Sequence, residues 1–197
     1  MRPLRVVLTL AVFAVAASAQ VAEFGANAGW NLLRNSGIGS LSTTNPSPDD
    51  VTLKDGFRLG FRLTFNTLNF FGHEVGYAYN RSPWHDSSSN TDAGSAVHQG
   101  FYDILVYGAP EGKKIRPFAA GGVQFSNFVF PGYSVTSGGG STKFGVNYGG
   151  GVKVKISPMF LIRFDVRNYM SPKPFGLPAQ TGWLKQLEAS AGFSFFM

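Results

Sequence analysis

The stretch from Phe144 to Tyr169 constrains the fold more than any other part of the chain, because its apolar and polar positions alternate strictly. A period of two is typical of a β-strand whose two faces meet different surroundings. Ser157 and Pro158 interrupt the alternation and predict a turn, so the stretch should form a hairpin. Each predicted strand has about a dozen residues, whereas an ordinary strand has about five or six. A hairpin of this length with an unbroken apolar face indicates a wall about as thick as a bilayer.

The first nineteen residues predict a secretory signal peptide. Arg2 and Arg5 supply a positive beginning, an apolar run follows from Val6 to Ala17, and residues 17–19 (Ala-Ser-Ala) form a small-residue cleavage site. This run is too short for a spanning helix, and no later stretch approaches the roughly 18 apolar residues that such a helix needs. We therefore expect residues 1–19 to be removed and residues 20–197 to form one domain.

The composition favours a membrane β-barrel over a soluble protein. Charged residues make up 14% of the chain, against about 25% in a typical soluble domain. Glycine and phenylalanine are abundant, with 25 and 19 residues, and cysteine is absent, which excludes disulfides and a lipid anchor on cysteine. The net charge is +6, but the Lys and Arg residues are spread along the chain, so we expect no nucleic-acid binding.

The alternation predicts eight strands in all. They cover residues 23–32, 55–66, 74–80, 97–108, 115–129, the two strands of the 144–169 hairpin, and 185–197. Long polar connections (34–54, 81–96, 130–142, 171–183) alternate with short ones (67–71, 109–114, 157–158). An even strand number with alternating long loops and short turns is typical of bacterial outer-membrane barrels. The predicted fold is an all-β, eight-stranded, antiparallel up-and-down transmembrane β-barrel in the bacterial outer membrane, with both termini in the periplasm.

A soluble lipocalin-like barrel would also alternate, with its apolar face inward. The glycine-rich polar face argues against it, because the interior of an eight-stranded barrel is only wide enough to be filled by side chains. Aromatic residues near strand ends also match the interfacial girdles of a membrane barrel: Trp30, Tyr79, Tyr102, Tyr107, Tyr169 and Trp183. We therefore expect the apolar side of the hairpin to face lipid, including Phe144, Val146, Val152, Val154, Ile162 and Phe164.

The charged residues of the polar face should then meet inside the barrel. They are Arg58, Arg62, Glu74, Asp103, Lys153, Arg163, Asp165, Arg167 and Glu188. An unpaired charge is costly in so narrow a space, so we expect a hydrogen-bonded ion-pair network. A structural plug is the favoured interpretation, and a gate or a path for protons or ions is the alternative.

Residues 116–125 (RPFAAGGVQF), the 144–169 hairpin and the last strand give the chain a resemblance to a known family. It resembles the eight-stranded outer-membrane β-barrels, such as the membrane domain of outer-membrane protein A and the opacity-type proteins. The resemblance implies a monomer that is not a wide pore and that sits in outer-membrane lipid and lipopolysaccharide. It also implies barrel-assembly machinery and periplasmic chaperones as partners in biogenesis. The assembly signal would be Phe193, Phe195 and Met197, with Met197 where the family usually has Phe.

The neighbouring residues His85, Asp86 and Ser87 suggest a hydrolase triad, but such a triad needs groups that converge in space. His73 and His98 lie on other segments. Because some eight-stranded outer-membrane barrels modify lipid A, such an enzyme stays an alternative, although no catalytic residue is assigned. No metal or cofactor site is expected, because cysteine and histidine pairs at ligand spacing are absent.

The four long loops are rich in Pro, Ser, Asn and Gly, and they carry Trp84, Tyr133 and Phe175, which we expect to be exposed. Binding commonly resides in loops on a rigid scaffold. The sequence therefore predicts a structural or surface-interaction protein, with ligand binding or adhesion through the loops as an alternative.

Overall fold

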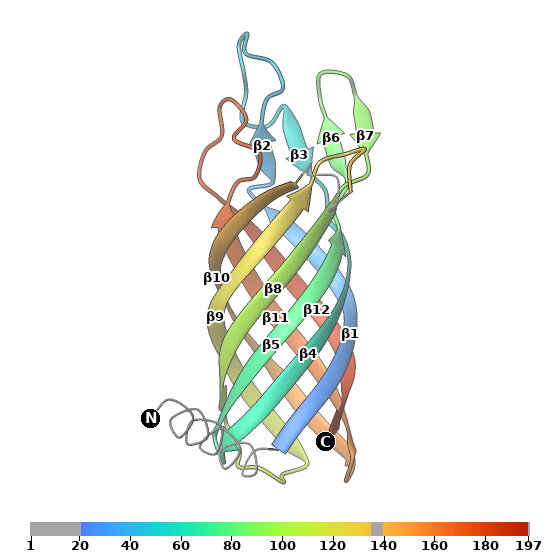
Figure 1. Ribbon diagram of the computed structural model, residues 1–197, viewed down its shortest axis with the longest axis vertical. Coiled ribbons are helices and arrows are strands. Elements are labelled where there is room, and N and C mark those ends of the chain that lie inside the picture. The colour runs from blue at the N-terminus through green and yellow to red at the C-terminus, as the bar shows by residue number, and fades with distance from the viewer. Residues whose placement is uncertain (1–20, 135–139, 197) are drawn as a thin grey trace, which may run out of the picture.

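The computed structural model describes residues 21–134 and 140–196, which form a closed antiparallel barrel with a small four-stranded sheet at one end (Figure 1). This confirms the predicted all-β, eight-stranded barrel. The predicted signal peptide (1–19) and Met197 lie outside the described residues. Within the described ranges, no helix is long and apolar enough to cross a membrane.

Eight long strands form the barrel wall. In order around the barrel they are β1 (Val21–Arg34), β12 (Trp183–Phe196), β11 (Phe160–Pro172), β10 (Gly140–Ser157), β9 (Ile115–Val129), β8 (Ala96–Tyr107), β5 (Phe71–Arg81) and β4 (Gly56–Leu68). Strand β4 pairs with β1 and closes the wall. All neighbouring strands are antiparallel, so every backbone donor and acceptor along the wall can be paired without a free sheet edge.

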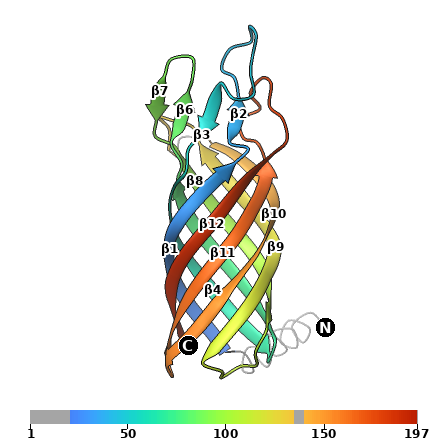
Figure 2. The ribbon, with the colours of Figure 1, turned by 180° about the vertical axis from the view of Figure 1, so that it is seen from behind.

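The connections alternate in length as expected. The short ones (69–70, 108–114 and 158–159) lie at one end of the barrel, and the long ones lie at the other. Strand β1 begins and β12 ends at the short-connection end, which the reverse view also shows (Figure 2). The predicted strand bounds agree with the observed ones to within a few residues, although β10 begins at Gly140 and β11 ends at Pro172, both within predicted loops.

The faces of the strands follow the period of two. On β11, Phe164 and Val166 are exposed on the outside, whereas Arg163, Asp165 and Arg167 are buried inside. On β10, Phe144 is 76% exposed on the outer face. The structure thus places bulky apolar residues outward and charged residues inward, the reverse of a soluble barrel.

Two of the six residues expected in the aromatic girdles face inward instead. Tyr107 and Tyr169 are both buried, at 3% and 0% exposure. Tyr169 shares its face of β11 with Arg167, two residues away, and Tyr107 shares its face of β8 with Asp103, four residues away. The pleat decides which side of the wall a residue faces, regardless of how close it lies to a strand end.

The long connections are not the unstructured loops that their composition predicts. Four short strands pair there in the order β2 (Gly37–Gly39), β3 (Val51–Leu53), β6 (Trp84–Asp86) and β7 (Thr91–Ala93). We call the described segments 35–55, 82–95, 130–134 and 173–182 the crown. Strands β2 and β3 pair within one connection and β6 and β7 within another, and the β3–β6 pairing joins the two connections.

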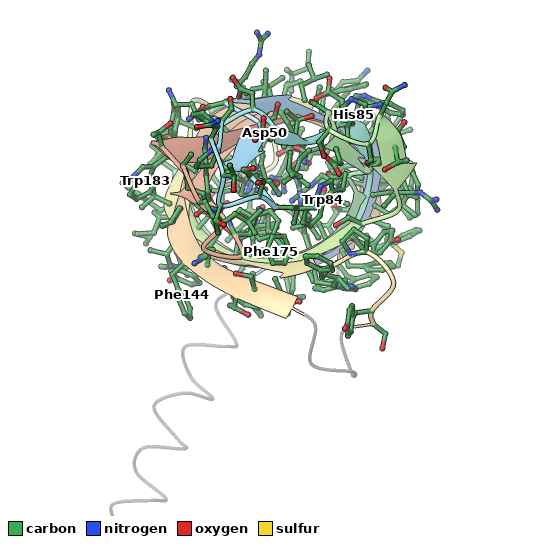
Figure 3. The ribbon with its side chains drawn as sticks, turned by 90° about the horizontal axis from the view of Figure 1, so that it is seen from above. Asp50, Trp84, His85, Phe144, Phe175 and Trp183 are labelled. Carbon is green, nitrogen blue, oxygen red and sulfur yellow. The ribbon has the colours of Figure 1, made fainter. Side chains whose placement is uncertain are left out.

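The crown has a hydrophobic core of its own, formed by Ile38, Val51, Leu53 and Trp84 with Val97, Phe128 and Leu184 from the barrel wall. The expectation that Trp84 and Phe175 are exposed is therefore wrong. Trp84 is 3% exposed, and its ring lies 5.5 Å from that of the half-buried Phe175. Seen from above, both residues lie over the barrel, whereas Phe144 and Trp183 lie at its outer edge (Figure 3). Tyr133 is exposed, as expected.

Candidate functional site: a charge-filled lumen

Strand β11 supplies the centre of the lumen, because its alternation brings Arg163, Asp165 and Arg167 to one face. Arg163 holds Asp165 with two parallel hydrogen bonds, from Nε to Oδ2 at 2.8 Å and from Nη2 to Oδ1 at 2.9 Å. Both arginines also donate to Glu74 on β5, and Arg167 donates to Asp103 on β8. Paired donors of this kind give the strongest carboxylate contacts that arginine can form.

Glu188 on β12 organises a second group of contacts. Nη2 of Arg62 donates to its Oε1 at 2.6 Å, and Nε of Arg58 lies 3.1 Å from its Oε2. The hydroxyls of Tyr169 and Ser190 donate to the same carboxylate, at 3.0 and 2.5 Å. Arg62 also lies 2.8 Å from Asp165, which joins this group to the central one.

The structure brings all nine predicted lumen residues inside the barrel, and every one of them takes part in a salt bridge. It also adds two charged residues that sequence reasoning missed. Glu23 on β1 pairs with Nζ of Lys153 at 2.6 Å, and Arg116 on β9 is buried beside them. Their phase in the alternation could have identified both, since Glu23 is two residues from Gly25 and Arg116 is two residues from Phe118 on the inward face.

Aromatic rings fill the space between the ion pairs. The guanidinium carbons of Arg167 and Arg62 lie 5.4 and 5.8 Å from the centre of the Phe101 ring, within the range of cation–π contacts. Gly76 makes room for that ring, because a Cβ atom there would lie 2.1 Å from its Cζ atom. Arg58 lies over the ring of Tyr169 in the same way, at 4.7 Å.

The crown core covers the loop end of the lumen. Val97 and Phe128 are buried at the crown end of β8 and β9, and Leu184 is buried at that end of β12. These residues belong to the same cluster as Trp84, so the apolar layer continues from the barrel into the crown. At the crown end of β9, the hydroxyl of Ser95 donates to the carbonyl of Val129 at 2.7 Å. Charge pairs, rings and this apolar cover together occupy the interior, which favours a plugged barrel.

The three residues of the suggested hydrolase triad do not converge. Nδ1 of His85 lies 2.7 Å from Asp92, whereas the Asp86 carboxylate accepts from the hydroxyls of Ser88 and Ser89. The hydroxyl of Ser87 points to the carbonyl of Asp49, at 3.4 Å. The Ser88 and Ser89 hydroxyls hold the pKa of Asp86 below its usual range, so this carboxylate is a fixed acceptor within its own turn.

The other two histidines lie on the outer face of the wall. Nδ1 of His73 lies 2.7 Å from the hydroxyl of Tyr102, and Nδ1 of His98 lies 2.5 Å from that of Tyr77. Each pair satisfies a tyrosine hydroxyl on an otherwise apolar surface. Within residues 21–134 and 140–196, no group of three His, Cys, Asp or Glu side chains could hold a metal ion.

Two residues of the expected assembly signal also lie on the outer face. Phe193 and Phe195 point outward from β12, and their rings surround that of Phe160 at 6.1 and 5.4 Å. Met197, the third residue of this signal, lies outside the described residues.

Comparison with known proteins gives this architecture its family. Residues 6–195 match the family model of the outer membrane protein beta-barrel domain. The chain belongs to this family. Membership indicates the bacterial outer membrane as its location. No curated protein sequence matches the chain.

Solved structures share the fold at low sequence identity. OprG from Pseudomonas aeruginosa has a TM-score of 0.60 at 12% identity and covers 90% of this chain and 97% of its own. Neisserial surface protein A has a TM-score of 0.57 at 13% identity, with coverages of 89% and 96%. Ail, the attachment invasion locus protein of Yersinia pestis, was solved with the heparin analogue sucrose octasulfate. It has a TM-score of 0.52 at 13% identity, with coverages of 90% and 99%.

Proposed function

We propose that this outer-membrane barrel is a non-conducting structural protein that presents its crown as an interaction surface. The observation that carries the proposal is the filled interior. Arg167 and Glu74 meet across the lumen, and the crown core lies above them. Opening such a path would leave several buried charges without partners, which costs several kcal/mol for each ion pair broken. The same cost argues against a gate or a proton path through the lumen.

Conductance in planar bilayers tests this function. The purified protein should show little or no steady conductance, because its interior holds side chains in place of a water column. The matched comparison is a variant with Arg58→Ser, Arg62→Ser and Arg167→Ser, which empties the lumen of three long side chains. Large, stable single-channel steps from the unmodified protein would reject the plug.

We further propose that the crown faces the cell exterior and that both termini face the periplasm. The support is the arrangement of the connections, since outer-membrane barrels keep short turns in the periplasm and longer loops outside. A protease added to intact cells should cut in the crown, for example near the exposed Leu41, and should spare the 108–114 turn. Cleavage only in the short turns would reverse the orientation.

The partners in this proposal are outer-membrane lipid and lipopolysaccharide around a monomer, and barrel-assembly machinery acting on β12. The outward position of Phe193 and Phe195 supports the last of these. Replacing both by Ser should slow assembly, whereas replacing the equally exposed Tyr102 and Ile104 by Ser should affect assembly rate less. Heat-modifiable migration on a gel, followed over time during refolding with the purified machinery, reports the rate.

Ligand binding through the crown is the second candidate function. The name of Ail, a structural relative by fold, refers to attachment, and its structure was solved with a sulfated heparin analogue. In this chain, the exposed Leu41 and Tyr133 belong to the crown, which contains an ordered four-stranded sheet. Leu41→Ser with Tyr133→Ser should weaken binding to host cells while heat modifiability persists. Binding that is unaffected by these changes would reject the crown as the site.

We propose no enzymatic activity, because the groups of the suggested triad bond to other partners. A lipid A deacylation and acyl-transfer assay in outer-membrane vesicles tests this. Activity that is lost in His85→Ala would overturn it and restore the lipid A-modifying enzyme.

A further inference from the structure

The lumen ends at the short-turn side in a cavity of about 270 Å³, which we call the vestibule. Arg116, Lys153 and Lys155 line it from β9 and β10, and Glu23 lines it from β1. Glu111 of the 108–114 turn lies at its edge, together with Lys113. The lining therefore carries four cationic and two anionic side chains, a formal excess of two positive charges.

The register of β9 and β10 brings the cationic side chains close together. Arg116 and Lys153 are direct partners in the β9–β10 ladder, and Lys155 follows two positions later on the same strand. Like charges directly opposite each other destabilise a sheet. Among the described residues, Lys153 is the member of this trio that forms a salt bridge, with Glu23.

Arg116 is buried, but its partners are neutral. Its guanidinium donates to the carbonyls of Asn69 and Ala109, at 2.8 and 3.2 Å, and to the side-chain oxygen of Asn66 at 3.3 Å. The guanidinium carbon lies 3.4 Å from the centre of the Tyr107 ring. Arginine has five N–H donors, so these three bonds leave two of them.

The surroundings of Lys155 and Glu111 also leave positive charge in the vestibule unbalanced. Nζ of Lys155 lies 5.1 Å from the ring of Phe196, a contact that supplies no full negative charge. Burial raises the pKa of Glu111 above its usual range, and this carboxylate is the one among the described lining residues besides Glu23 that can balance Arg116, Lys113 and Lys155. The vestibule thus holds positive charge, free donors and space at one place.

We propose that the vestibule binds a phosphate-like oxyanion between Arg116 and Lys155. The planar guanidinium matches the geometry of a phosphate group, and lysine adds a mobile positive charge. The phosphate could come from solution or from the headgroup of a lipid at the rim of the barrel. The bound oxyanion would supply the counter-charge that Arg116 and Lys155 lack.

Titration with inorganic phosphate tests the site on the protein refolded in dodecyl maltoside micelles, which carry no phosphate, at constant ionic strength and pH 7.5. Backbone amide shifts of Gly112, Lys155 and Phe196 should saturate, whereas those of the distant Lys54 and Asp92 should not respond. Lys155→Gln should weaken binding about threefold to tenfold, as expected for losing one charge-assisted hydrogen bond near water. Lys155 lies at the mouth, so its replacement spares the buried lumen.

Two matched variants test whether binding depends on the vestibule, and a second titration, with a lipid, identifies the source of the phosphate. Lys114→Gln removes an exposed lysine that does not line the vestibule and should change the affinity less than about twofold. Glu111→Gln removes a competing carboxylate and should tighten binding. In the second arm, phosphatidylglycerol is added to the micelles and inorganic phosphate is omitted. Saturable shifts at the same amides in either arm support the site and tell the two sources apart. Shifts that fail to saturate in both arms, or an equal loss in Lys114→Gln and Lys155→Gln, would overturn it.

Discussion

Nη2 of Arg167 on β11 lies 2.6 Å from Oε1 of Glu74 on β5. These strands are four positions apart in a closed ring of eight, so the ion pair spans the barrel from one side to the other. Both side chains are fully buried. The contact therefore ties opposite walls together in addition to neutralising two charges.

Arg167→Met tests the importance of this tie. The change leaves Glu74 and Asp103 with less counter-charge in a buried site, so it should lower the free energy of unfolding by about 3–5 kcal/mol. Equilibrium unfolding in urea, with the protein in lipid vesicles, measures the loss. Arg34→Met, at the exposed end of β1, serves as the control and should change stability by less than about 0.5 kcal/mol. An equal, small effect of both variants would show that the lumen network adds little stability.

The period of two predicted most of the wall, because a pleated strand must turn successive side chains to opposite faces. It placed Arg163, Asp165 and Arg167 together with no knowledge of their partners. Nearness to a strand end is a weaker guide than the period of two, and the girdle prediction that depends on it is wrong for two tyrosines. Tyr107 and Tyr169 lie near strand ends, which predicts the girdles, but their phase in the alternation predicts the inside, where both are buried.

The crown could not be predicted in the same way. Its strands have three residues each, too few to show a period, and the β3–β6 pairing that joins them into one sheet links two connections distant in sequence. The one signal was the presence of Ile38, Val51, Leu53 and Trp84 in otherwise polar stretches. Large apolar residues that recur in polar loops indicate a local core, since exposing all of them would be unfavourable.

The placement of β11 across the bilayer can be tested by introducing an arginine on the outer face at two different depths. Phe164→Arg, near the middle of the strand, should lower the free energy of unfolding by about 2–4 kcal/mol, because an arginine at the bilayer midplane is poorly solvated. Ile115→Arg places the same charge on the outer face at the end of β9, where the cost should be about 0–1 kcal/mol. Unfolding in urea from vesicles measures both. Equal costs would contradict the placement of β11 across the bilayer.

The crown core should be separable from the barrel. Trp84→Ala removes the ring that packs against Phe130 and Phe175, so it should cost about 3–5 kcal/mol of crown stability. The wall keeps its ion pairs, and heat-modifiable migration on a gel should persist. Limited proteolysis should then cut the crown much faster than in Tyr133→Ala, in which an exposed ring is lost. A Trp84→Ala protein with unchanged proteolysis would show that this core does not hold the crown together.

The crown should also respond to acid before the barrel does. Nζ of Lys54 and Nδ1 of His85 lie 2.8 and 2.7 Å from Oδ1 of Asp92. These two groups hold the pKa of Asp92 below its ordinary value of 3.8. A carboxylate with a lower pKa in the folded state stabilises that state above its unfolded pKa and loses the effect as the pH falls through the folded value. Hydrogen exchange of the β6–β7 amides should therefore accelerate relative to the barrel as the pH falls below about 4, after correction for intrinsic rates. Asp92→Asn should weaken this response, whereas a response of unchanged size would show that the acid sensitivity arises elsewhere, for example at Asp86, whose pKa is also lowered.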